Sequence, residues 1–167
     1  MLLVNREPIA QALFTILAGA YPWATKSRQA KIWTSSDPQP AMYLIAPSEN
    51  DQQPEMALTE YKLNYLCLVY FKADPEPDGS AAHPYPDTVI NAMIGAIEAK
   101  LGTPTGERVQ NMQVVGQQPV IAPGNAAAPT PVTNVINCWI DGRIDKDSGI
   151  LDSQCAILIP IVVFCGI

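Results

Sequence analysis

Residues 58–71, LTEYKLNYLCLVYF, alternate between two faces, and the character of one face changes halfway along. The odd-numbered side is apolar throughout: Tyr61, Leu63, Tyr65, Cys67, Val69 and Phe71. The even-numbered side begins with three polar residues and continues with three apolar ones: Glu60, Lys62, Asn64, Leu66, Leu68 and Tyr70. Because successive side chains of a strand point to opposite faces, we predict a long strand. We expect one face of this strand to be buried along its whole length, and the other face to be buried only along its second half.

Residues 153–167 repeat this pattern at the end of the sequence. One face is apolar: Cys155, Ile157, Ile159, Ile161 and Val163. The opposite face starts with the polar Gln154 and then carries Leu158, Val162 and Phe164. We expect this strand and the strand over 58–71 to lie side by side, with their two-sided ends in one place.

Residues 134–144 alternate as well and predict a further strand, followed by a turn at DKDSG. One of its faces is apolar: Ile136, Cys138, Ile140 and Ile144. The other face is mostly polar: Asn137, Trp139, Asp141 and Arg143. Two shorter strands are predicted nearer the N-terminus, over 27–33 and 41–46, with polar loops over 47–56 and 72–86.

Two segments show helical spacing instead. The first runs from Asn5, a suitable N-cap, to Ala18, and Gly19 and Pro22 end it. Its apolar stripe is Ile9, Leu13, Ile16 and Leu17. The second runs from Pro86 to Leu101. Its stripe is Ile90, Met93, Ile94, Ile97 and Leu101, which predicts a helix packed against a sheet.

The predicted order is α-β-β-β-α-(arm)-β-β within a single domain, residues 1–167. The arm, 103–131, is rich in Pro, Gly, Ala and Gln; it is either a surface insertion or an ordered segment with a hairpin of ERVQNMQVV and PVIA across GQQ. This order predicts the α+β class: a mainly antiparallel sheet with two helices on one face. The helices cannot also cover the apolar positions of the other face, so we predict a subunit or partner interface there. Its candidate residues are Leu66, Leu68, Tyr70, Leu158, Val162 and Phe164.

Composition supports a covered surface and argues against nucleic-acid recognition. Hydrophobic residues make up 48% of the 167 residues and charged residues only 16%, below the usual quarter. The net charge is −6 without a long basic run, which argues against groove binding to DNA or RNA. Neither the N-terminal MLLVNREPIA nor the C-terminal AILIPIVVFCGI has the length of a signal or membrane segment. We therefore expect a soluble protein in a reducing cytoplasm, with no membrane partner.

Residues that often carry chemistry are few, and we predict no enzyme, no cofactor and no metal site. The four cysteines, Cys67, Cys138, Cys155 and Cys165, lie in apolar stretches without CxxC spacing, so buried free thiols are expected. The single histidine, His83, needs an orienting carboxylate and a nucleophile to act as a base. DKDSG within 141–152 lacks the glycine and the closing glutamate of a calcium loop. Four aromatic residues suggest a base-stacking platform, but without a basic groove sheet packing is the better interpretation: Trp33, Tyr61, Tyr65 and Trp139.

Four segments, in this order, resemble the tail terminator (tail completion) proteins of phages with long, non-contractile tails. They are VNREPIAQALFTIL, SRQAKIWTSSDPQPAMYLI, YKLNYLCLVYF and NCWIDGRIDKDSGILDSQCAILIPI. The resemblance covers most of the chain, and it is the ordered set rather than any one motif that is specific. It does not extend to 103–131, a segment longer than this family usually carries.

The resemblance implies a mixed sheet with two helices and a homohexameric ring on the head-proximal end of the tail tube. Its implied partners are copies of itself, the major tail tube protein and a head–tail connector or stopper protein. DNA only passes through the channel, whose candidate lining residues are Glu60, Asp141, Asp145 and Asp147. The implied location is the virion tail, after assembly in the host cytoplasm, and no catalytic residue is implied. The alternatives are a head-completion or connector ring protein and, in another class, a small α+β ligand-binding domain or enzyme.

Overall fold

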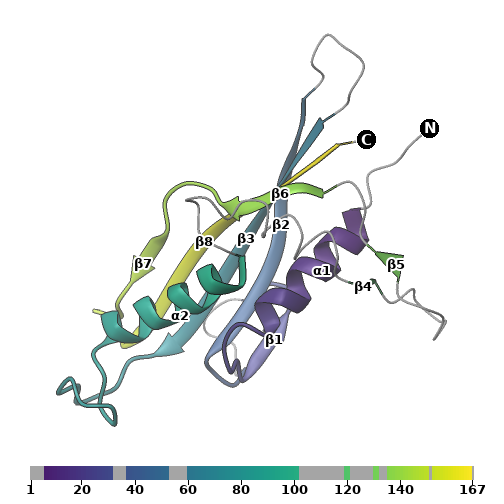
Figure 1. Ribbon diagram of the computed structural model, residues 1–167. Coiled ribbons are helices and arrows are strands. Elements are labelled where there is room, and N and C mark those ends of the chain that lie inside the picture. Colours follow the sequence, from purple (N-terminus) through teal and green to yellow (C-terminus); the bar gives the residue numbers. More distant parts are fainter. Residues whose placement is uncertain are drawn as a thin grey trace.

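The computed structural model describes residues 6–31, 37–52, 60–101, 119–120, 130–131, 135–150 and 152–166. Within these ranges the chain forms two helices, α1 (Arg6–Ala18) and α2 (Pro86–Leu101), and eight strands. Figure 1 shows their arrangement. The strands are β1 (Thr25–Ser27), β2 (Ala41–Gln52), β3 (Glu60–Lys72), β4 (Pro119–Val120), β5 (Thr130–Pro131), β6 (Val135–Ile140), β7 (Asp145–Asp147) and β8 (Gln154–Gly166).

Six of the strands form one mixed, mainly antiparallel sheet in the order β1-β2-β3-β8-β6, with β7 also pairing β8. Only β1 runs parallel to its neighbour, β2. Both helices lie on the same face of this sheet: α1 over the side of β1 and β2, and α2 over the side of β8 (Figure 1). The α+β class and the single helix layer predicted from the sequence are confirmed.

Strands β3 and β8 form the centre of the sheet and pair along their full length, from Glu60↔Gly166 to Lys72↔Gln154. The two strands lie side by side as expected, but their two-sided ends overlap only where Leu68 stands directly opposite Leu158. Val162 and Phe164 stand opposite the polar residues Asn64 and Lys62 instead. The odd-numbered face of β3 is the face under the helices.

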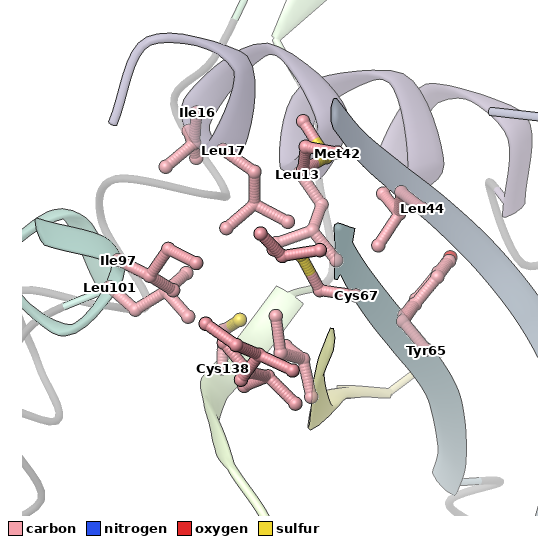
Figure 2. Packing of buried hydrophobic residues seen from close by; sticks show 14 of the residues in the cluster. Leu13, Ile16, Leu17, Met42, Leu44, Tyr65, Cys67, Ile97, Leu101 and Cys138 are labelled. Carbon is pink, nitrogen blue, oxygen red and sulfur yellow. The ribbon is translucent and has the colours of Figure 1, made fainter. Parts of the chain in front are cut away.

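The core lies between this face and the two helices (Figure 2). Both helical stripes are buried, with Leu13, Leu17 and Ile97 fully inside. From the sheet, β3 and β8 contribute Leu63, Tyr65, Cys67, Val69, Phe71, Cys155, Ile157, Ile159, Ile161, Val163 and Cys165. Each of these side chains is at most 5% exposed. At about 25 cal/mol per Å² of apolar surface, this burial is the main force that holds the helices on the sheet.

The N-terminal strands differ from the expectation. Of the strand predicted over 27–33, only Ser27 lies in a described strand, Thr25–Ser27, because Arg28 leaves the sheet to form an ion pair with Glu7 on α1. Residues 32 and 33 lie outside the described residues. Strand β2 continues to Gln52, beyond the predicted end at Ala46, because β3 supplies hydrogen-bonding partners along its whole length. The predicted cap Asn5 lies outside the described residues.

The predicted strand over 134–144 is also divided. It ends at Ile140, and Gly142, with φ 101°, turns the chain before β7. Asp145–Asp147 is therefore a strand rather than the predicted turn, and the turn follows at Gly149, with φ 73°.

Pro160 lies where β8 is not paired with either β6 or β7, and its carbonyl accepts from the Asp141 amide at 3.0 Å. The N–H and C=O of one residue in an antiparallel strand point to the same side. Pro160 has no N–H to donate, and its nitrogen faces this unpaired stretch of β8. The proline therefore removes no hydrogen bond from the sheet.

Little of the predicted arm belongs to the described residues. Pro119–Val120 pairs with Thr130–Pro131, and β4 lies beside α1 (Figure 1). The predicted hairpin across GQQ would pair 119–122 with 107–115, but Pro119–Val120 pairs with Thr130–Pro131 instead. Residues 107–115 lie outside the described residues.

Candidate subunit interface

The face of the sheet that points away from α1 and α2, here called the second face, carries the predicted interface. The cross-strand register brings together four half-buried apolar residues, here called the outer patch: Leu66, Leu68, Tyr70 and Leu158. The predicted interface residue Phe164 is also half-buried, but it stands apart from them, opposite Lys62. Among the described residues no helix lies on this face (Figure 1). The outer patch is therefore an apolar sheet surface on which the described part of the chain places no second layer.

The sixth predicted interface residue, Val162, is only 2% exposed. It stands between Asn64 on β3 and Trp139 on β6. Above this strand Lys62 donates to Asp141 at 2.8 Å, and the Trp139 indole N–H donates to the same carboxylate at 3.2 Å. This cluster spans β8 and accounts for the burial of Val162 within the subunit.

Tyr43 closes the second face on the side of β2. It stands opposite Leu68, and its ring lies 6.0 Å from that of Tyr70. Its hydroxyl donates to Asp37 at 2.8 Å, and the side chain is only 1% exposed. The outer patch is thus bounded by two residues, Tyr43 and Val162, that the chain itself buries.

Three of the four predicted channel residues are placed on or beside this face. Asp145 and Asp147 share it with their register partners Leu158 and Ala156. Asp141 lies at the end of β6, where the hydrogen bond from Lys62 holds the pKa of its carboxyl below the usual value.

These acidic residues are largely engaged with neighbouring groups. Asp145 accepts from Arg143, and Asp147 accepts from the Gly149 amide. For Glu60, only the backbone pairings with Gln52 and Gly166 are described. The register thus gathers acidic groups around the outer patch, but those at Asp141 and Asp145 are paired with cations.

The other candidate residues are not brought into one site. His83 Nδ1 lies 3.0 Å from the Asp74 carboxylate on an exposed loop, and the Ser80 hydroxyl accepts from the backbone N–H of His83. Trp139 lies on the second face and the buried Tyr65 on the helix face, so these two do not form a common platform. Trp33 lies outside the described residues.

The cysteines and the acidic loop give no sign of a metal centre in the described part of the chain. All four cysteines are buried and free, as predicted. Burial raises the pKa of the Cys67 and Cys138 thiols to about 12. Across the residues that the structure describes, no three His, Cys, Asp or Glu side chains are grouped to hold a metal ion.

Neither described helix combines the length and the apolar character that crossing a membrane requires.

Sequence reasoning missed the Lys62–Asp141–Trp139 cluster and the role of Tyr43. Lys62 and Asp141 are 79 positions apart, and only the register of β3, β8 and β6 brings them together. Tyr43 lies within a predicted strand, but nothing in AMYLIA indicates that its hydroxyl reaches Asp37.

In comparisons with protein-family models and with curated proteins, the chain matches none of them.

Proposed function

We propose that this chain is a structural protein of a phage tail, which assembles into a ring at the head-proximal end of the tail tube. The ring ends the polymerisation of the tube protein and offers its other side to a head–tail connector. DNA passes through the channel without sequence-specific contacts. The proposal combines the resemblance of four ordered segments with one feature of the fold.

That feature is the outer patch. Two layers of secondary structure, helices and sheet, bury the odd-numbered face of β3 from Leu63 to Phe71, whereas Leu66 and Leu68 beside them stay half-buried. Contiguous apolar surface on a folded domain usually marks an interaction site. A second copy or the tube protein supplies the layer that this subunit lacks.

The edges of the sheet support association through the face rather than through strand addition. Among the described residues, β1 pairs only with Ala41–Tyr43, so the rest of β2 forms an edge. That edge carries Pro47 and an irregular register between Ile45 and Ser48. Proline and bulges are the devices by which natural sheets discourage edge pairing. A ring further requires two different patches on each subunit, and the outer patch is one of them.

The deciding experiment is electron microscopy of tails assembled without this protein. Uncontrolled tube length is expected, because no ring stops the polymerisation, and complementation by the wild-type chain should restore a uniform length. Tubes of normal length would contradict the role. Labelling the protein in intact particles then separates the top of the tube from a position against the portal, where a connector protein would lie.

A further inference from the structure

A bulge in β2 opens a pocket on the helix face of the sheet. Between the pairs Ile45↔Leu66 and Ser48↔Asn64, the two residues Ala46 and Pro47 face Tyr65 alone. A bulge bends its strand and redirects the side chain opposite. The resulting pocket, here called the bulge pocket, has a volume of about 360 Å³ and lies beside the first turn of α1.

Tyr65 lines this pocket and is only 5% exposed. Its hydroxyl oxygen points away from Cys138 and Leu101 in the centre of the core (Figure 2). Among the described residues the hydroxyl has no hydrogen-bond partner, although nearly all buried polar groups have one. Burial raises the pKa of Tyr65 above its ordinary value, so the group remains a protonated donor.

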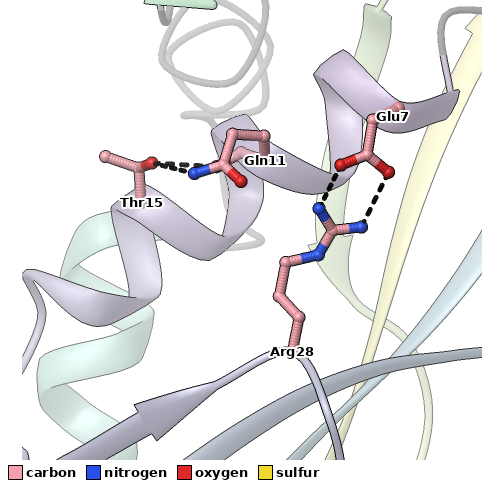
Figure 3. A network of polar contacts seen from close by, with 4 residues as sticks. All are labelled: Glu7, Gln11, Thr15 and Arg28. Atoms are coloured by element: carbon pink, nitrogen blue, oxygen red, sulfur yellow. Dashed lines mark hydrogen bonds and ion pairs between the residues drawn. The ribbon is translucent and has the colours of Figure 1, made fainter. Parts of the chain in front are cut away.

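Two arginine–glutamate pairs line the same pocket. Arg28 donates through Nη1 and Nη2 to both oxygens of Glu7 (Figure 3). Arg6 donates through Nε and Nη2 to both oxygens of Glu49, at 2.7 and 2.6 Å. All four carboxylate oxygens are thus engaged.

The two guanidinium groups still have donors to spare. Arg28 Nε and Arg6 Nη1 have no hydrogen bond among the described residues, and a guanidinium carries five N–H donors. Together with the Tyr65 hydroxyl, they are donors of this pocket that have no partner among the described residues. The N-terminus of α1 adds positive potential at the same place.

We propose that the bulge pocket binds a carboxylate group with a short apolar tail. The Tyr65 hydroxyl and the free guanidinium N–H groups donate to the carboxylate, and Leu63 and Ala10 contact the tail. The pocket lies on the opposite side of β3 from the outer patch, so its occupant is distinct from the layer that covers the outer patch. The carboxylate belongs either to a free small molecule or to a second copy of this chain.

The test is a titration of the ¹⁵N-labelled protein with butyrate, followed by amide chemical shifts, with butyramide and sodium chloride as controls. Saturable shifts near Tyr65 and Ala46 are expected with butyrate alone. The variant Tyr65→Phe keeps the ring and removes only the donor. It should bind butyrate about 10-fold more weakly or worse, as expected for a lost hydrogen bond to a charged group. Absence of saturable shifts, or equal affinity of the variant, would overturn the proposal.

Chemical denaturation without ligand gives a second readout. If the Tyr65 hydroxyl has no partner within the subunit, Tyr65→Phe should leave the unfolding midpoint unchanged or raise it. A clear fall in the midpoint would reveal an internal partner and overturn the proposal.

The two sources of the carboxylate are separated by dilution. Shifts of Tyr65 that grow with protein concentration without butyrate, and vanish in Tyr65→Phe, assign the carboxylate to a second copy. Shifts that depend on butyrate but not on protein concentration assign the pocket to a free small molecule.

Discussion

Placing a carboxylate at Leu68 separates an interface from a core, and Val69 provides the matched control. The two residues are adjacent on β3 but point to opposite faces. Val69 is 0% exposed under the helices, whereas Leu68 is half-buried in the outer patch. The same substitution at the two positions therefore has different consequences.

For Val69→Asp, the loss of the buried side chain costs about 1.5–3 kcal/mol. Burying an unpaired carboxylate adds several kcal/mol. The sum is comparable with the whole free energy of unfolding of a typical domain, about 5–15 kcal/mol. We expect Val69→Asp to be unfolded, with a lost thermal transition in circular dichroism.

For Leu68→Asp, the carboxylate reaches water in the isolated subunit, and the expected cost is about 1 kcal/mol. The subunit should therefore keep its fold and a slightly lowered melting temperature. If the outer patch is covered by a neighbour, each contact then buries an unpaired charge at about 3–5 kcal/mol. That corresponds to an association constant lower by about 100-fold to several thousand-fold.

Sedimentation velocity over a range of concentrations measures the association, and complementation of tails assembled without this protein tests the proposed function. Leu68→Asn, neutral and of similar shape to the aspartate, separates the charge from the loss of apolar surface. A folded Leu68→Asp protein that assembles like the wild type would refute the interface. Unfolding as complete as that of Val69→Asp would show that the subunit itself covers this face.

Three smaller predictions test the energetics of the fold. Since burial raises the pKa of the Cys67 thiol to about 12, a thiol reagent at pH 8 should modify it only after denaturation, and rapid labelling of the native protein would contradict this. Lys62 lowers the pKa of Asp141, so the pair stabilises the fold above the unfolded-state pKa of 3.8 and its contribution is lost as the pH falls through the lowered pKa. Lys62→Met should therefore cost about 0.2–1 kcal/mol at neutral pH, with a difference from wild type in urea unfolding that disappears in acid. Gly95 in α2 has open space where the Cβ of an alanine would lie, so Gly95→Ala should stabilise the protein by about 0.5–1 kcal/mol. Gly149 has φ 73°, and an alanine Cβ there would lie 2.9 Å from Ser153, so Gly149→Ala should destabilise the protein. Thermal melts that give the reverse order would refute the argument.

The sequence was sufficient to predict a helix or strand where that element depends mainly on its own residues. Helix α2 has the predicted bounds because Pro86, Asp87 and Lys100 act within the helix itself. The long strands β3 and β8 were likewise predictable from alternation over a dozen residues. That the two strands pair was predicted, but their register was not, because the apolar Val162 and Phe164 stand opposite the polar Asn64 and Lys62.

The predictions failed where distant residues decide the structure. The segment PSENDQ is polar and contains a proline, yet it forms a strand because β3 pairs with it. Nothing in the segment itself indicates that this pairing outweighs its low preference for strands. The bulge opposite Tyr65 and the short parallel β1 depend on register in the same way. For the candidate interface, periodicity gave the correct face for Leu68 and Leu158. It could not show that Val162 on β8 is covered by a cluster of side chains from β3 and the end of β6.

The dimensions of the elements explain why the outer patch is where it is. Helices of 13 and 16 residues are about 20 and 24 Å long, whereas strands of 13 residues extend about 43 Å. The helices therefore cover only part of the long strands, and the β2–β3 hairpin projects beyond them (Figure 1). On the second face, the residues of β3 toward the projecting end are polar, Lys62 and Asn64, and those toward the other end are apolar, from Leu66 to Tyr70. The apolar half thus lies behind the helix layer, where a third layer would complete a sandwich, whereas in the polar half Lys62 is already paired with Asp141 within the subunit. A sequence with this division on one face, and continuous burial on the other, is suited to a sheet that a neighbouring molecule completes.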